Sequence, residues 1–179
     1  PIRRETVVAA NSPRRYVNRV TREGPDALSD LGPLARFYMP PLPYPGPSAA
    51  YRAQWDAIMA AALAAMPQEH EDAAASRSYA GSENALQAQA LWDAAMGHAI
   101  AEALDVAPGA VVVHFVGSFH VERGTGIPER IEDYRPGTAV VTVVMTKSED
   151  TDAWSAESHE GLPDIVVLTL EPSAAEDPG

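Results

Sequence analysis

The side chain best placed for chemistry is the imidazole of His120, which follows an apolar run at 111–116 and the glycine Gly117. A strand that is apolar on both faces is typical of the interior of a parallel sheet, and such sheets bind ligands at the carboxyl ends of their strands. Gly117 would let a ligand approach the backbone, and His120 would present a metal-binding nitrogen. The pattern predicts a ligand or metal site, with a hydrogen-bonded loop histidine as the alternative.

A second candidate site is the start of a predicted helix at 13–21. Asn11 precedes it, and Arg14 and Arg15 lie in its first turn together with Tyr16. Free N–H groups at a helix start and planar guanidinium groups both suit a carboxylate or a phosphate. The segment therefore predicts an anion-binding site, and a solvated arginine face is the alternative. Tyr16 could supply a phenolate ligand or simply pack against the core.

Asp93 lies on the apolar stripe of a predicted helix at 83–104. A carboxylate in such a position is costly unless it is paired, so we expect Asp93 to accept a hydrogen bond and to orient a ligand histidine. His114 lies inside the apolar strand, and we expect it to be a buried, hydrogen-bonded core residue. Ser118 lacks the Gly-x-Ser-x-Gly context of a nucleophile, and no catalytic serine is predicted.

Helices and strands alternate along the chain in a way that would position these residues. Ser12 as N-cap with Pro13 at the first helical position marks the first helix, and Ser82 marks the last. We predict helices at 13–21, 28–38, 49–66 and 83–104, and strands at 6–10, 111–116, 139–145 and 165–170. Strands that are nearly all apolar predict an α/β fold with a mostly parallel sheet flanked by helices on both faces. Asn11 and His120 would then meet at one edge of this sheet.

The domain organisation is predicted to be simple. We expect one domain over 1–170, with a proline-rich connection at 39–47, a mobile acidic loop at 67–82 and an acidic tail at 171–179. The chain opens on Pro1 rather than methionine and reaches a strand almost at once. This domain could therefore be the carboxyl-terminal part of a larger one.

Composition narrows the possible partners. The 179 residues contain 13 basic and 25 acidic side chains, a net charge of −12, and this field repels nucleic acid and anionic lipid. The absence of cysteine excludes disulfides and thiolate metal sites. No apolar run approaches the roughly 18 residues that a membrane-spanning helix needs. We expect no nucleic-acid partner, and membrane contact only through a lipid anchor upstream of this sequence.

Four segments occur in the order found in the ChaN family of haem-binding lipoproteins, within the Tiki-like superfamily. The segments are 8–16, 88–96, 117–120 and 124–128. The chain resembles this family, which implies an α/β fold that binds haem, often as a dimer, in cell-envelope iron handling. The family's earlier glutamate and histidine motif has no counterpart in this sequence. Carried over by position, the pocket residues would be Asn11, Arg14, Arg15, Asp93, Gly117 and His120.

The resemblance and the residues together predict a haem-binding protein of cell-envelope haem or iron uptake, without a catalytic step of its own. His120 or Tyr16 would bind the iron, and Arg14 and Arg15 would face the propionates. We expect a periplasmic or cell-envelope location, and a homodimer or a larger envelope assembly. The alternatives are a metal-dependent hydrolase of the Tiki-like type, which would hold a divalent metal in the same pocket, and a degenerate structural subunit.

Overall fold

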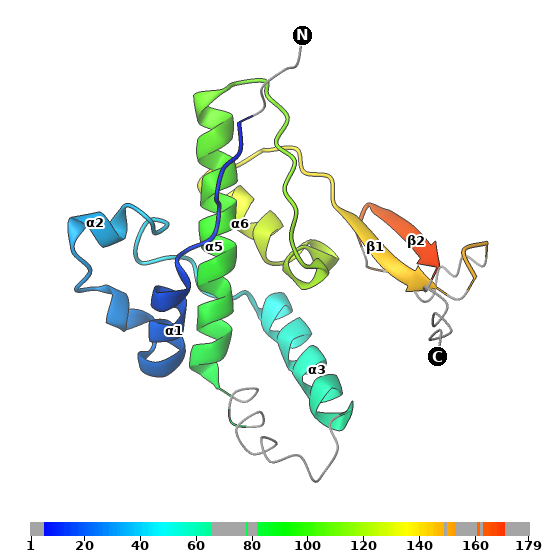
Figure 1. Ribbon diagram of the computed structural model, residues 1–179, viewed down its shortest axis with the longest axis horizontal. Helices are drawn as coiled ribbons and strands as arrows, with labels where there is room; N and C mark the ends of the chain where they lie inside the picture. The colour runs from blue at the N-terminus through cyan, green and yellow to red at the C-terminus, as the bar shows by residue number, and fades with distance from the viewer. Residues whose placement is uncertain are drawn as a thin grey trace, which may run out of the picture.

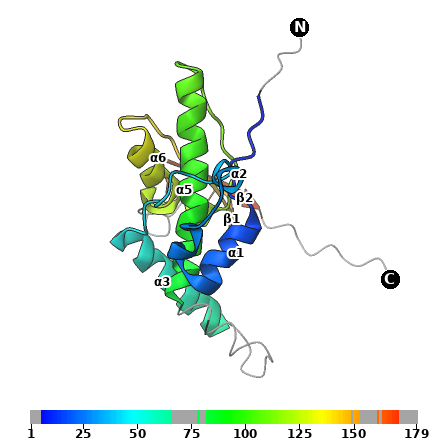
Figure 2. The same ribbon diagram turned by 90° about the vertical axis from the view of Figure 1, so that its left-hand side faces the viewer.

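A long helix, α5 (Glu83–Val106), forms the centre of the molecule (Figure 1). The computed structural model describes residues 6–65, 78, 82–148, 150–152, 161 and 163–170. Helices α1 (Arg14–Glu23) and α6 (Ile127–Tyr134) both contact α5, and Figure 2 with Figure 1 shows them on opposite sides of it. The alanine-rich sequence of α5 suits this position, because small side chains let both neighbours approach closely. The predicted helix at 83–104 is confirmed, with two further residues at its end.

Helix α3 (Ala49–Ala65) confirms the helix predicted at 49–66. It begins after Ser48, whose hydroxyl oxygen accepts a hydrogen bond from the backbone N–H of Tyr51 at 3.0 Å, as a helix N-cap does. Tyr51 and Trp55, one turn apart, pack against the first turn of α5. This contact places one face of α3 beside the middle of the molecule.

One predicted helix start and one predicted helix are wrong, whereas the start of α5 after Ser82 is as predicted. Pro13, and not Ser12, is the N-cap residue of α1, because the Ser12 side chain is buried and its hydroxyl points at the sulfur of Met39. Ser82 does precede α5, but its side chain forms no capping hydrogen bond. The helix predicted at 28–38 is two short turns, η1 (Pro25–Leu28) and α2 (Pro33–Arg36), since Gly32 and Pro33 interrupt it.

Two strands form the paired sheet in the described part of the chain. Strands β1 (Val143–Ser148) and β2 (Ile165–Leu170) are parallel, with Val143 opposite Ile165 and Ser148 opposite Leu170. The predicted strand at 165–170 and the parallel α/β class are confirmed. The ladder begins at 143 rather than 139, because the Asp164 side chain accepts the backbone N–H of Thr142 at 2.7 Å and β2 starts only beyond it.

The other two predicted strands are extended but are not paired with any described strand. Residues 6–10 and 111–116 belong to no ladder in the described chain, and the Phe115 side chain is 90% exposed. Figure 1 shows the β1–β2 pair set apart from the helices, so helices do not cover both of its faces as predicted. The physical reason is that an extended run needs a neighbouring strand to form a sheet, and the described residues supply none next to these runs.

The proline-rich connection at 39–47 contains neither helix nor strand, but it packs closely on α5. Met39 and Tyr44 are buried, and the Tyr44 hydroxyl donates a hydrogen bond to the backbone carbonyl of Gln87 at 2.9 Å. The acidic loop predicted at 67–82 and the tail at 171–179 lie outside the described residues, apart from positions 78 and 82. In the described chain, no helix combines the length and the apolar character that crossing a membrane requires.

Candidate functional site

A buried carboxylate on the central helix is paired with the imidazole of His120. Asp93, on α5, is only 1% exposed, and its Oδ1 is hydrogen-bonded to Nδ1 of His120. His120 ends the single turn η2 (Ser118–His120), and its side chain is 17% exposed. The carboxylate can only accept at this contact, so Nδ1 carries the proton and donates it. Nε2 of His120 is then the nitrogen left for a ligand, which is the arrangement that orients metal-binding histidines.

The surroundings of Asp93 oppose a free negative charge. Burial raises the pKa of Asp93, and the hydrogen bond and charge of His120 act against that rise. Burial and the nearby Asp93 carboxylate also raise the pKa of Tyr51, which comes from α3. The Tyr51 hydroxyl is close enough to interact with Asp93, yet neither it nor Oδ2 of Asp93 forms a hydrogen bond of ordinary geometry. His120 is therefore the partner that compensates this buried carboxylate.

Gly126 allows the backbone after His120 to lie directly on Asp93. A Cβ at this position would be 2.6 Å from the carbonyl oxygen of His120 and 3.2 Å from Oδ2 of Asp93. Its φ is +66°, in the left-handed region that favours glycine. Since α6 starts at the next residue, this glycine sets how closely α6 and the His120 turn approach α5.

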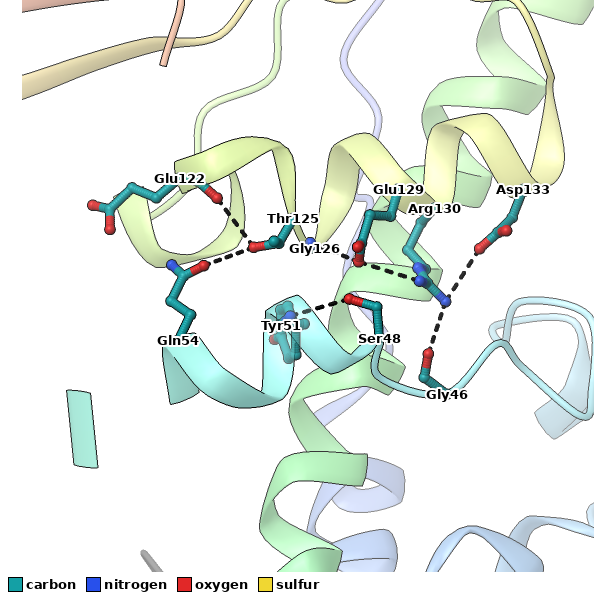
Figure 3. Close-up of polar contacts among 10 residues, drawn as sticks. All are labelled: Gly46, Ser48, Tyr51, Gln54, Glu122, Thr125, Gly126, Glu129, Arg130 and Asp133. Carbon is teal, nitrogen blue, oxygen red and sulfur yellow. Dashed lines mark hydrogen bonds and ion pairs between the residues drawn. The ribbon is translucent and has the colours of Figure 1, made fainter. Parts of the chain in front are cut away.

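Gln54, on α3, contacts the chain on both sides of His120, and Figure 3 shows its contact with Thr125. Its Nε2 donates to the carbonyl oxygen of Phe119 at 3.2 Å, and its Oε1 accepts from the Thr125 hydroxyl at 2.7 Å. The ring of Phe119 also contacts Tyr51 and Trp55. Helices α3 and α5 thus fix the position of the His120 side chain.

Arg130 ties α6 to the proline-rich connection (Figure 3). This guanidinium is almost fully buried, donates to the carbonyl oxygen of Gly46 at 3.1 Å and forms ion pairs with Asp133 and Glu129. Sequence reasoning missed this residue, as it did Tyr51, Gln54, Thr125 and Gly126. For Tyr51 and Gln54, the sequence signal that could have found them is Ser48. A capping serine after a proline-rich segment fixes the start of α3, and positions 51, 54 and 55 then share one face of that helix.

The structure brings three of the predicted site residues together. Asp93 and His120 are paired, and the carbonyl oxygen of Gly117 accepts the backbone N–H of His120 at 3.1 Å. Asn11 is exposed and follows Ala10, which packs in one cluster with Val116 and Val121 on either side of the His120 turn. These contacts place the end of the 6–10 run close to this turn.

The arginine segment is not joined to His120 by any contact in the described chain. Arg14 and Arg15 are exposed on α1, where Arg15 stacks on the Tyr16 ring at 4.6 Å and donates to its hydroxyl at 3.0 Å. α1 and α6 lie on opposite sides of α5, so α5 stands between these arginines and the side on which α6 packs (Figure 2). The convergence of Arg14, Arg15 and Tyr16 with His120 on one cavity therefore stays a prediction.

His114 differs from its predicted role as a hydrogen-bonded core histidine. It is half-buried, and its Nε2 is buried without a hydrogen-bond partner in the described residues. Burial lowers the pKa of His114, and the nearby His120 side chain lowers it further. The neutral imidazole is thus favoured at this position.

In the described residues the oriented donor at this site is one histidine, a ligand that haem iron accepts. In the described part of the chain, no group of three or more histidine, aspartate or glutamate side chains is placed to hold a metal ion. A closed protein site for a divalent ion needs several such ligands, whereas haem iron takes its equatorial ligands from the porphyrin and needs only one or two from the protein. One histidine with a free, oriented Nε2 meets that need.

Fold and site together define an α/β protein in which a buried carboxylate of the central helix orients a histidine of a neighbouring turn. A family model described as haem-binding uptake, Tiki superfamily, ChaN, matches residues 3–131. The chain belongs to this family, as the sequence resemblance predicted, and haem is the ligand that the family description indicates. No match was found among the curated proteins or among the solved structures.

Proposed function

We propose that this protein binds haem through Nε2 of His120 and serves haem or iron uptake in the cell envelope, without a catalytic step of its own. The observation that carries the proposal is the hydrogen bond between Asp93 and Nδ1 of His120. It fixes the tautomer and the ring orientation before any ligand arrives. The family description, haem-binding uptake, supports the same ligand and the same kind of process.

Haem, when bound, supplies an iron centre that accepts a histidine nitrogen and two propionates that accept hydrogen bonds from cations. In this proposal, His120 provides the nitrogen. Tyr16 is the other side chain able to bind iron, but its hydroxyl already accepts a hydrogen bond from Arg15. The donor favoured by the geometry is therefore His120.

Haem titration of the purified protein, followed through its Soret absorption, tests the proposal. Replacement of an axial ligand costs at least as much affinity as loss of a hydrogen-bond partner of that ligand, so we expect His120→Ala to weaken binding by more than about tenfold. His98→Ala is the matched control, because His98 lies on α5 and pairs with Glu102 away from the site. Equal affinities of the His120→Ala variant and the unchanged protein would refute the assignment.

Two further measurements separate the remaining possibilities. Tyr16→Phe should leave the affinity within about twofold, and a large loss would transfer the axial role to Tyr16. Fractionation of cells that produce the protein should place it in the periplasm or the envelope. Metal analysis that finds a stoichiometric divalent ion, with a hydrolytic activity that a chelator removes, would favour the metal-dependent alternative instead.

A further inference from the structure

A large apolar groove separates the two extended runs that flank α6. Its volume is about 940 Å³, and it lies between residues 109–116 on one side and residues 137–145 on the other. Side chains of α5 and α6 form its floor, including Ile100, Leu104, Ile127 and Ile131. Arg135 is the sole charged side chain in the described lining. The groove therefore suits an uncharged occupant.

Both runs are apolar, and within the described residues 111–116 and 139–141 pair with no strand. Val111 and Val113, on one face of the first run, are 87% and 71% exposed, and Val141 in the second run is 68% exposed. In the described chain, the backbone groups of 111–116 and 139–141 form no hydrogen bonds with other backbone groups. Exposed strand edges with apolar side chains are a template for pairing with another strand. The missing contacts are thus those that a neighbouring strand makes.

The direction of the missing strand follows from the connection. The first run passes through the His120 turn and α6 into the second run, and a helical crossover of this kind joins parallel strands. Figure 1 shows the first run descending alongside α5, which points the opposite way, and the second run leading away from α5 into β1. β1, which continues the second run, already pairs in parallel with β2 on one edge, and its residues Val143 to Met145 also line the groove. A strand in the groove would continue this sheet.

The chain itself offers no spare segment for the position. The sequence outside the described elements, at 1–5, 66–81, 149–162 and 171–179, contains no uncharged apolar run of strand length. The extended run at 6–10 already packs through Ala10 against the apolar cluster of α5 and α6 that includes Ile100 and Ile127. A second copy would have to give up this contact to insert its own run.

We propose that the groove receives an extended polypeptide segment from outside residues 1–179, apolar on both faces, as a parallel strand between 110–116 and 139–145. A segment of about seven residues spans each run at about 3.3 Å per residue. It would form hydrogen bonds with the backbone N–H and C=O groups of both runs and cover their exposed valines. A lipid or a small apolar molecule could cover the valines but could not also pair with the backbone. The proposal does not depend on haem binding.

A synthetic peptide of residues 163–171 is a suitable probe, because its strand β2 pairs in parallel with β1 in the structure. Amide hydrogen exchange of the whole chain should show fast exchange at 111–116 and 139–141. An excess of the peptide should slow exchange at both runs by more than about tenfold. The same peptide with Val167→Pro, which removes a ladder donor, should protect neither run.

Two exposed valines provide matched variants of the whole chain. Val141→Asp places a charge in the groove and should abolish protection by the peptide, whereas Val106→Asp, at the end of α5 outside the groove, should retain it. Light scattering gives the mass of the peptide-free chain. A dimer with both runs already protected would show that a second copy fills the groove and would overturn the proposal. Protection of both runs in a monomer, or equal protection by the proline peptide, would overturn it too.

Discussion

Replacement of Asp93 by asparagine tests how much the buried carboxylate contributes to the affinity of His120 for iron. Asparagine has nearly the same shape, and its Oδ1 can still accept the Nδ1 proton, so Asp93→Asn removes the charge and retains the contact. A charge-assisted hydrogen bond is about twice as strong as a neutral one, and loss of such a partner typically lowers metal affinity about 10-fold to 100-fold. Because Asp93 is 1% exposed, solvent cannot replace the lost interaction. We expect a loss in this range.

The control is a second carboxylate–histidine pair on the same helix. Glu102 lies 3.5 Å from Nδ1 of His98, with 68% of its side chain exposed, and such exposed pairs contribute about 0–1 kcal/mol. Glu102→Gln should leave haem affinity within about twofold, measured by the same Soret titration. Circular dichroism of each variant would establish that it folds. If Asp93→Asn and Glu102→Gln bind haem equally well, the carboxylate does not act through His120 and the reasoning is refuted.

Three further predictions concern the scaffold of the site, and urea denaturation measures each. Gly97→Ala should lower the free energy of unfolding by about 1–3 kcal/mol, because the new Cβ would lie 2.4 Å from Cβ of Arg130. Gly32→Ala is the control, because the space around Gly32 is open, and it should lower the free energy of unfolding by less than about 0.5 kcal/mol. Gln54→Ala should cost about 1–3 kcal/mol, since it leaves the Thr125 hydroxyl and the Phe119 carbonyl without this partner; an unchanged value would show that water replaces the amide. Arg52 holds the pKa of Glu83 at about 2, so the stability from this pair is present above about pH 4.5 and is lost as the pH falls toward 2. Glu83→Gln should remove this acid-dependent stability, which is under about 1 kcal/mol for so exposed a pair. A free energy of unfolding that falls more steeply with pH in the variant than in the unchanged protein would contradict the prediction.

Sequence reasoning succeeded where the signal is local. The helices at 49–66 and 83–104 follow from composition and from apolar spacing, and both are present nearly as predicted. The parallel pairing of the strand at 165–170 follows from its near-continuous apolar character. Asp93 stood out because a carboxylate on an apolar stripe must find a partner, and the structure pairs it with His120.

Sequence reasoning failed where the outcome depends on distant segments. Ser12 has the type and position of an N-cap, but its side chain is turned inward toward Met39, which lies 27 residues away. The contacts of Gln54 span 65 and 71 residues, and nothing in the local pattern distinguishes it from a solvated helix glutamine. The apolar run at 111–116 predicts a strand. The sequence of the run does not identify the strands that would pair with it.

His120, the proposed iron ligand, and the groove between the two extended runs are supported by different parts of the molecule. His120 is held by Asp93 of α5, while Gln54 of α3 fixes the adjacent Phe119 backbone. None of these contacts involves the backbone of the open run at 111–116. Orientation of the imidazole should therefore not require a strand in the groove. A chain whose groove is empty should still bind haem in a His120-dependent way, and a chain that has lost His120 should still accept a strand.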